Sequence, residues 1–236
     1  MAVTELISSH ALVYLGNQPK NRGGGLRIKT LSLLTRFEGE RPFAVQLFGK
    51  DPELVAEAAR MVEASGADIV DLNFGCPARK VVKGGEGAGV ALMRSPVLLQ
   101  RIATRVQKAV SIPVTAKIRL GWSKQELTAP EIAERLQDVG IEAITIHARY
   151  RDQVHSGPVD LEALAETCAR VDTPIIGNGG IRSAEDAKTM ISRTGCRRVA
   201  VGQGAKGNPW IFDSIKSGNP EPALKERIET FKRHVL

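Results

Sequence analysis

The sequence predicts an α/β fold, a TIM-type (β/α)8 barrel that is incomplete and contains seven of the eight strands. Short runs of β-branched and apolar residues alternate with amphipathic helical stretches along the chain, and this alternation indicates a parallel sheet covered by helices. The runs are nearly continuously apolar, as expected for parallel strands that are buried on both faces. Because the common closed parallel barrel has eight strands, we expect one strand–helix unit to be missing before Met1.

The predicted strands comprise residues 3–7, 43–48, 68–73, 114–118, 143–147, 174–177 and 198–202. Helices are expected between most of them, and several carry start or stop signals. A capping residue followed by proline stands at Asp51-Pro52 and at Ser95-Pro96, and this pair favours a helix start. Capping-box spacing occurs from Thr128 to Glu131 and from Ser183 to Asp186, and C-terminal cap positions are occupied by Gly66 and Gly140.

An open, doubly wound sheet is the alternative architecture. Such a sheet usually carries a Gly-x-Gly-x-x-Gly turn after its first strand, and none follows Ile7. The run Gly23-Gly24-Gly25 lies between two helical stretches, so we interpret it as a flexible loop. The barrel is therefore the predicted fold.

Two units are expected along the chain. Residues 1–215 are predicted to form the N-terminally truncated barrel domain, and residues 216–236 a linker with one helix. The run Gly-Asn-Pro-Glu-Pro at 218–222 is typical of a break between units. The charged helical segment at 223–236 is too short to form a core. We interpret it as the first helix of a truncated C-terminal helical domain or as a single covering helix.

Composition restricts the compartment and the class of partner. Although 42% of the 236 residues are hydrophobic, no apolar run approaches the roughly 18 residues of a membrane helix. The N-terminus lacks a secretory signal pattern. Three cysteines without a disulfide framework fit a reducing compartment, so we expect a cytoplasmic protein. The net charge of +7 permits an anionic partner, such as nucleic acid or a phosphorylated cofactor, without requiring one.

Polar residues follow the predicted strands at the rim where barrel enzymes place their active sites. These residues are Gln46, Asn73, Cys76, Lys117, Arg119, His147, Arg149, Arg151, Asn178, Gly179, Gly180, Gly202 and Gln203. Because the C-terminal ends of parallel strands meet on one rim, we expect these residues to converge. Three further basic residues, Arg79, Lys80 and Lys83, also follow a strand end.

Cys76 stands in a Gly-Cys-Pro turn, which favours a bent loop over the alternative of a packed core cysteine. Its thiol is able to act as a nucleophile, a general acid or a redox centre. No Cys-x-x-Cys is present, which argues against a dithiol centre, and Cys168 and Cys196 are interpreted as structural.

Lys117 is the only ionisable residue in its strand run and needs an anionic or electron-rich partner. Lys117 is able either to stabilise negative charge on a flavin ring or to form a Schiff base with a carbonyl substrate. His147 is either a ligand contact or a satisfied core histidine. No second histidine or carboxylate stands at metal-ligand spacing, so no metal site is predicted.

Two glycine-rich turns, at 178–180 and 202–204, fall where such barrels build their phosphate site. Glycine lets backbone N–H groups approach an anion closely, and Arg182 is a further candidate partner. The alternative is that these glycines only form tight turns.

Seven ordered motifs are similar to those of bacterial FMN-dependent tRNA-dihydrouridine synthases, from about Thr4 to Phe212. They are Val-Gln-Leu-Phe-Gly at 45–49, Asp-Leu-Asn-Phe-Gly-Cys-Pro at 71–77, Lys-Ile-Arg-Leu-Gly-Trp at 117–122, His-Ala-Arg-Tyr-Arg at 147–151, Ser-Gly-Pro at 156–158, Asn-Gly-Gly-Ile at 178–181 and Gly-Asn-Pro-Trp-Ile-Phe at 207–212. The resemblance implies that NADPH reduces a bound FMN, which then reduces the C5–C6 bond of a tRNA uridine. It also implies that Cys76 protonates C5.

The resemblance implies roles for the remaining rim residues. Flavin-ring and ribityl contacts would come from Gln46, Lys117 and His147, and phosphate contacts from Asn178, Gly179, Gly180, Gly202 and Gln203. Asn73, Arg119, Arg149 and Arg151 would face the RNA, whose target uridine must leave its stack. Two departures stand out: Gln203 replaces the usual arginine of the phosphate loop, and Gly180 replaces a common acidic residue.

Two alternative functions are retained. One is an FMN barrel oxidoreductase that acts on a free pyrimidine, and the other is a non-catalytic remnant or RNA-binding module. The basic rim and the Gly-Asn-Pro-Trp run at 207–210 favour the tRNA enzyme.

Overall fold

The computed structural model describes residues 1–16, 31–35, 39, 41–82, 87–154, 156–220 and 222–235. Its main sheet is parallel throughout and has the strand order β1-β3-β4-β5-β8-β9-β10, with β2 also paired to β3. The strands are β1 (Ala2–Val3), β2 (Ile7–Ser8), β3 (Phe43–Phe48), β4 (Ile69–Asn73), β5 (Val114–Arg119), β8 (Ala143–His147), β9 (Ile175–Asn178) and β10 (Arg198–Ala200). The run 23–25 and Lys83, both discussed above, lie outside the described residues.

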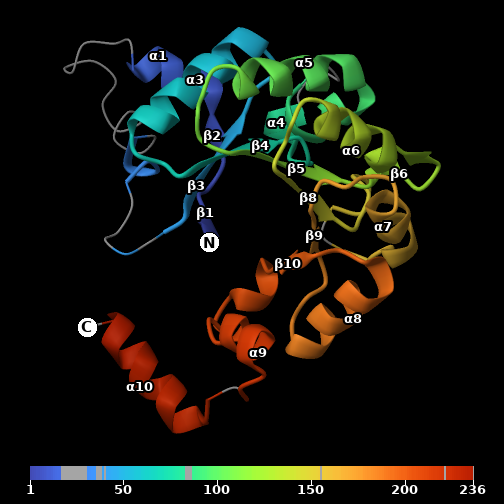
Figure 1. Cartoon of the computed structure of the whole chain (residues 1–236). Coiled ribbons are helices and arrows are strands. Elements are labelled where there is room, and N and C mark those ends of the chain that lie inside the picture. Colours follow the sequence, from blue (N-terminus) through green and yellow to red (C-terminus); the bar gives the residue numbers. More distant parts are fainter. Residues whose placement is uncertain are drawn as a thin grey trace.

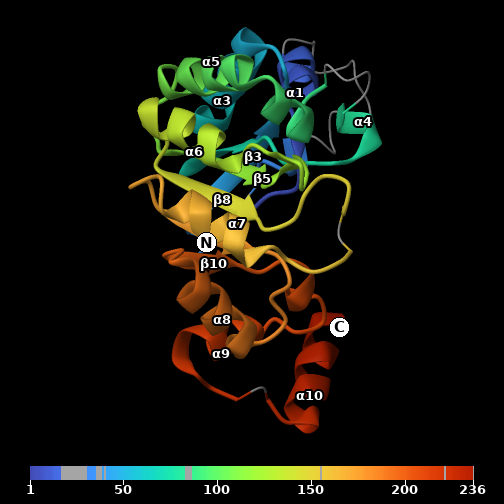
Figure 2. The ribbon, with the colours of Figure 1, turned by 90° about the vertical axis from the view of Figure 1, so that its right-hand side faces the viewer.

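The sheet curls as in a (β/α)8 barrel, and helices cover its convex side (Figures 1 and 2). The helices are α1 (Ser9–Gly16), α3 (Pro52–Ala64), α4 (Arg79–Val82), α5 (Pro96–Gln107), α6 (Ala129–Asp138), α7 (Leu161–Cys168), α8 (Ala184–Thr194), α9 (Ile211–Ser217) and α10 (Leu224–Val235). Two 3-10 helices are η1 (Gly89–Arg94) and η2 (Gln203–Ala205). In the described part of the chain β1 and β10 are not paired with each other. The prediction of an incomplete barrel is confirmed.

The predicted strand at 3–7 is present but interrupted. β1 and β2 both pair with β3, and Thr4–Leu6 leaves the ladder between them. At this point the Thr4 hydroxyl accepts a hydrogen bond from the backbone N–H of Gln46 at 3.0 Å. A side-chain acceptor thus replaces a carbonyl of the ladder, so the strand continues after the break without leaving this donor unpaired. A short antiparallel hairpin, β6 (Gly121–Ser123) with β7 (Glu126–Leu127), was not predicted.

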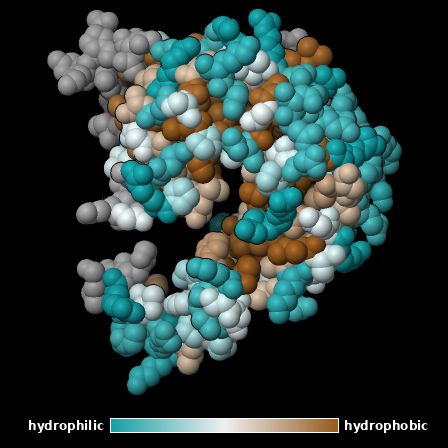
Figure 3. Space-filling model, in the orientation of Figure 1, coloured by the Kyte–Doolittle hydropathy of each residue, from teal (hydrophilic) through white to brown (hydrophobic). Residues whose placement is uncertain are grey.

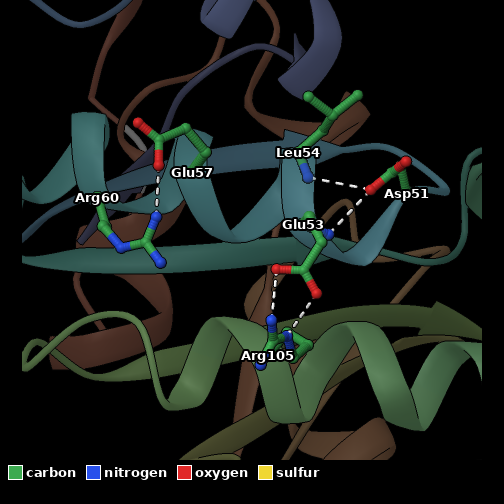
Figure 4. Close-up of polar contacts among 6 residues, drawn as sticks. All are labelled: Asp51, Glu53, Leu54, Glu57, Arg60 and Arg105. Carbon is green, nitrogen blue, oxygen red and sulfur yellow. Dashed lines mark hydrogen bonds and ion pairs between the residues drawn. The ribbon is translucent and has the colours of Figure 1, made fainter.

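Helix α3 begins with the predicted pair of a capping aspartate and a proline. The Asp51 carboxylate accepts from the backbone N–H groups of Glu53 and Leu54 at 2.9 and 3.1 Å (Figure 4). Those two groups have no partner within the helix, and Pro52 has no N–H to satisfy. Glu53 then pairs with Arg105 of α5 through two bonds of 2.7 and 2.5 Å, which joins the neighbouring helices on the surface (Figure 4).

The other caps match the predictions in part. Ser183 accepts from the backbone N–H of Asp186 at 3.1 Å, as capping-box spacing predicts. Gly66 and Gly140 have φ of +86° and +81°, so both adopt the left-handed conformation that ends a helix. Helices α5 and α6 begin at the predicted residues, but Ser95 and Thr128 make no side-chain cap bond.

The two faces of the sheet differ in chemistry. Side chains on the convex face, such as Val70, Leu72 and Ile118, are at most 1% exposed and pack with the helices in the core. The alternate positions face the barrel interior, and many of them are polar, including Asp71 and Thr115, which pair in register. The expectation of nearly continuous apolar strands was therefore wrong for the inner face. Because successive side chains point to opposite faces, an alternation of period two was the signal for it.

The concave side of the sheet opens to a hollow in the molecule (Figure 3). Helix α10 stands apart from the barrel at one end of the chain (Figure 1). Its Arg227 lies 5.7 Å from the ring centroid of Trp210, which precedes α9. The predicted boundary at 215/216 falls inside α9 and stays a prediction. None of the described helices is both long and apolar enough to cross a bilayer.

Candidate active site

A cavity of about 810 Å³ lies at the C-terminal ends of the strands. All the predicted site residues except Gln46 and Arg151 line it, and they are Asn73, Cys76, Lys117, Arg119, His147, Arg149, Asn178, Gly179, Gly180, Gly202 and Gln203. The wall also includes Val3, Glu5 and Leu6 from the interrupted first strand. The volume is within the range of about 300–1,000 Å³ that small-molecule and cofactor sites occupy.

The loop that carries Cys76 is held by the side chain of Asn73. The Asn73 Oδ1 atom accepts from the backbone N–H groups of Cys76 at 2.9 Å and Gly75 at 3.2 Å. Gly75 lies so close to the Ile118 backbone that an added Cβ would stand 2.9 Å from the Ile118 carbonyl carbon. A Cβ added to Gly89 would likewise stand 2.6 Å from the Cys76 carbonyl oxygen. The half-buried Cys76 is thus fixed from both sides by backbone contacts.

Beneath this loop lies a chain of buried polar side chains. Asn73 Nδ2 donates to Gln46 Oε1 at 2.8 Å, and Gln46 Nε2 donates to Asp71 Oδ2 at 2.5 Å. The Thr115 hydroxyl donates to the other Asp71 oxygen at 2.6 Å. Asn73, Gln46 and Asp71 are only 7%, 8% and 5% exposed. Gln46 therefore lies below the cavity wall, where both ends of its amide are already hydrogen-bonded.

Lys117 projects into the cavity beside Asn178. Its Nζ donates to Asn178 Oδ1 at 3.2 Å, while Asn178 Nδ2 donates to the Ala200 carbonyl at 2.7 Å. Burial, and then the nearby positive charge of Arg119, lower the pKa of Lys117 to about 8, against the opposing influence of Asp71 and Cys76. The lysine is therefore a cation that sits in a site of low polarity, where it would stabilise an anionic partner.

His147 is oriented by a cation from its own strand end. Arg149 Nη1 lies 3.1 Å from His147 Nε2, and because a guanidinium only donates, this ring nitrogen is the acceptor. Arg149 also donates from Nε to the Gly157 carbonyl at 2.9 Å. Burial, and then the charge of Arg182, lower the pKa of Arg149.

The two glycine-rich turns pack against each other and against His147. Gly179 and Gly180 have φ of +109° and +75°, and a Cβ on Gly179 would stand 2.8 Å from His147 Cδ2. A Cβ on Gly204 would stand 2.2 Å from the Ile181 carbonyl oxygen. Side chains are excluded from these positions, so the backbone is free to approach a ligand. Arg182 and Lys206 line the same end of the cavity.

Comparisons with known proteins identify the family of the chain. Residues 1–236 match the sequence profile described as dihydrouridine synthase (Dus). The chain belongs to the dihydrouridine synthase family. It is 36% identical to a probable tRNA-dihydrouridine synthase of Rhizobium leguminosarum bv. phaseoli, over 99% of this chain and 69% of the relative. It is 39% identical to tRNA-dihydrouridine synthase B of Xanthomonas axonopodis pv. citri, over 83% of this chain and 63% of the relative.

The Arg119 side chain is buried and hydrogen-bonded to backbone. Its side chain is 2% exposed and donates to three backbone carbonyls, those of Gly75 at 3.0 Å, Tyr150 at 3.1 Å and Val154 at 2.6 Å. Burial lowers its pKa to about 10. Three of its five N–H groups join the Cys76 loop to the loop after β8. Arg119 therefore holds these loops together, and its expected contact with RNA stays a prediction.

Arg151 lies outside the cavity of this family member, on the hairpin side of the rim. Its guanidinium carbon is 4.6 Å from the ring centroid of Trp122, and that of Arg94 is 4.4 Å from it. Arg94 is also tied to Glu126 by two bonds of 2.6 and 2.9 Å. Stacking on the indole restricts the Arg151 side chain and leaves its N–H groups at the surface.

Four residues at or below the cavity were missed from the sequence. Asp71 and Thr115 complete the buried chain below Cys76, and Glu5 and Lys206 line the cavity. The alternation of polar and apolar residues in β4 and β5 was a usable signal for the first two. Nothing local marks Glu5 or Lys206, because the tertiary fold alone brings them to the rim.

Proposed function

We propose that the chain reduces the C5–C6 bond of uridine in tRNA, with FMN bound in the cavity, NADPH as reductant and Cys76 as proton donor. Membership of the dihydrouridine synthase family supports the reaction. The observation that carries the assignment of residues is the cavity itself. Cys76, Lys117, His147 and the two glycine turns come from separate strands, and all of them line this one cavity.

The phosphate end of FMN fits the glycine turns. The φ values of Gly179 and Gly180 and the close packing of Gly204 make a cradle that any Cβ would fill. Gly202 has no atom within 4 Å of its added Cβ. Gln203 stands where the resemblance implies an arginine, and Arg182 and Lys206 provide cations for the same end. A dianionic phosphate is held well by backbone N–H groups with nearby cations.

The ring end of FMN fits Lys117 and His147. A bound FMN would supply a hydride to C6 of the uracil, having been reduced by NADPH. Lys117 would stabilise negative charge on the reduced ring, and its bond to Asn178 holds Nζ in place for that contact. Gln46 has one amide hydrogen and one lone pair left over, so a direct contact to the ring would add to its present bonds.

Cys76 would protonate C5 from the face opposite the hydride donor. A proton donor on the far side of the ring is what stepwise addition of two hydrogens requires. Asn73 fixes the Cys76 backbone, and Arg119 fixes the Gly75 carbonyl before it. Lys117 and Arg119 line the same cavity as the Cys76 thiol.

The rim arginines would bind the RNA backbone. Arg149 lines the cavity mouth and Arg151 is held by Trp122 beside it, so both cations would lie near phosphates that flank the flipped uridine. We also retain residues 216–236 as a linker and first helix of a separate RNA-gripping unit. Helix α10 carries four basic residues, Lys225, Arg227, Lys232 and Arg233.

Replacement of Cys76 by alanine tests the proposal directly. The variant is expected to bind FMN and to be reduced by NADPH at the normal rate, while uridine reduction in tRNA falls by roughly 10²–10⁴-fold. Flavin absorbance measures the first two, and mass spectrometry of tRNA nucleosides measures the third. Cys168→Ala is the matched control, since this half-buried thiol lies on α7 away from the cavity, and it should reduce tRNA normally.

Two results would contradict the proposal. Normal dihydrouridine formation by Cys76→Ala would exclude the thiol as the proton donor. Turnover of free uracil or uridine without turnover of tRNA would assign the cavity to a free pyrimidine instead.

A further inference from the structure

We propose that Asp71 is a positioning residue, which sets the orientation of the Gln46 and Asn73 amides and through them holds the Cys76 loop. The inference deepens the proposed function and rests on it for its catalytic consequence. Its structural part stands on the hydrogen bonds alone.

Every link in the chain has only one workable direction. The backbone groups of Gly75 and Cys76 are N–H donors, so Asn73 must turn Oδ1 toward them. Nδ2 of Asn73 then faces Gln46, which must offer Oε1 and therefore points Nε2 away. The far end must accept. A carboxylate offers an acceptor to Gln46 in either orientation, because it accepts on both oxygens and donates on neither, while an asparagine would also need its amide turned the right way.

Asp71 meets that requirement with both oxygens. Oδ2 accepts from Gln46 at 2.5 Å, and Oδ1 accepts from the Thr115 hydroxyl at 2.6 Å. The strand register puts Gln46, Asp71 and Thr115 side by side on the inner faces of β3, β4 and β5. At 5% exposure, water offers Asp71 little alternative. A buried polar network of this kind restricts its members when all of them are satisfied.

The consequence concerns Cys76. If Gln46 turned its amide around, Asn73 would follow and present Nδ2 to two N–H groups, and the loop would lose its side-chain cap. The loop would keep only its backbone contacts and the bond from Arg119 to Gly75. The thiol would then no longer be held against the cavity, although the glycine turns after β9 and β10 would be unchanged.

A reciprocal exchange tests this inference. Gln46→Glu places a second carboxylate against Asp71 and is expected to open the loop. Asp71→Asn alone is expected to have a small effect, because the Thr115 hydroxyl can turn to accept. In the double variant Gln46→Glu/Asp71→Asn the asparagine donates to the new carboxylate, which still accepts from Asn73. Each hydrogen bond between positions 71, 46 and 73 is restored, and the negative charge has moved from position 71 to position 46.

Amide hydrogen exchange of residues 73–77 provides a readout that does not depend on catalysis. We expect exchange to become at least roughly tenfold faster in Gln46→Glu, less than threefold faster in Asp71→Asn, and close to the unmodified protein in the double variant. The rate of tRNA reduction should follow the same order when it is measured at saturating FMN, because Gln46 is itself an expected flavin contact. Asp68→Asn is the control, because Asp68 lies at the opposite end of β4 and binds Arg41 and Phe43.

The outcomes separate the two proposals. Unchanged loop exchange in Gln46→Glu, or a double variant no better than that single one, would overturn the role of Asp71. Altered and restored exchange in a protein that never reduces tRNA would keep the positioning chain and remove the proposed function. If Gln46→Glu fails to fold, Gln46→Met removes the link without adding charge and should show the same faster exchange.

Discussion

The two sides of the cavity are built in different ways. On the Cys76 side, the supporting residues Asn73, Gln46, Asp71 and Arg119 are buried and are held by side-chain hydrogen bonds. On the opposite side, glycine turns after β9 and β10 form the wall, and Gly202, Gln203 and Lys206 are exposed. One side positions a reactive group through its neighbours, whereas the other leaves backbone free for a ligand. Substitutions on the Cys76 side should therefore destabilise the protein by removing hydrogen bonds. Substitutions on the glycine side should destabilise it by adding atoms where the backbone is closely packed.

The largest expected effect is on the buried side, at Arg119. Arg119→Met keeps most of the side-chain volume but leaves the carbonyls of Gly75, Tyr150 and Val154 without their donor. Unpaired buried acceptors cost free energy, so we expect the free energy of unfolding to fall by about 3 kcal/mol. Urea denaturation measures it. The exposed Arg101 on α5 is the control, and Arg101→Met should change stability by less than about 0.5 kcal/mol. Equal effects of the two substitutions would remove the contrast between the sides.

The glycine side should respond to a single added methyl group. Gly204→Ala would place Cβ 2.2 Å from the Ile181 carbonyl oxygen, so the turns must separate. We expect a loss of about 2 kcal/mol in unfolding free energy and roughly tenfold weaker FMN binding, as measured by flavin titration. Gly202→Ala is the matched comparison, since no atom lies within 4 Å of its Cβ, and its unfolding free energy should be nearly unchanged. A stable Gly204→Ala protein with normal FMN affinity would contradict the proposal that the glycine turns hold the FMN phosphate.

The smallest expected effect is at Lys117. This residue links the two sides of the cavity, because it comes from β5 and donates a hydrogen bond to Asn178 of β9. Its pKa of about 8 in the folded chain is below the ordinary value of 10.5. The folded state therefore binds fewer protons than the unfolded state between these values, and stability from this group rises as the pH increases through that window. Between pH 7.5 and 9.0 we expect the unmodified protein to gain about 1 kcal/mol relative to Lys117→Met. Urea denaturation at both pH values checks this, and parallel pH profiles would show that Lys117 is not desolvated.

Local patterns in the sequence determined the order of the elements. Parallel strands, helix starts at Pro52 and Pro96, and helix ends before Gly66 and Gly140 all follow from residue periodicity and caps, which act over a few residues. The same patterns placed Cys76, Lys117 and His147 at strand ends, and the barrel topology brings strand ends together. The curl of the sheet then gathers them around one cavity.

Only the tertiary structure decided how the polar groups pair. The contacts expected of Gln46 with the flavin and of Arg119 with the RNA stay predictions. The fold adds partners that the sequence did not indicate, since Gln46 lies in a buried chain with Asp71 and Arg119 donates to three carbonyls. Lys206 reaches the cavity from beyond β10. These pairings depend on the register between strands and on loops far apart in the chain. A hydrogen bond needs its partner within about 3 Å, and residue type at one position carries no information about which distant residue arrives there.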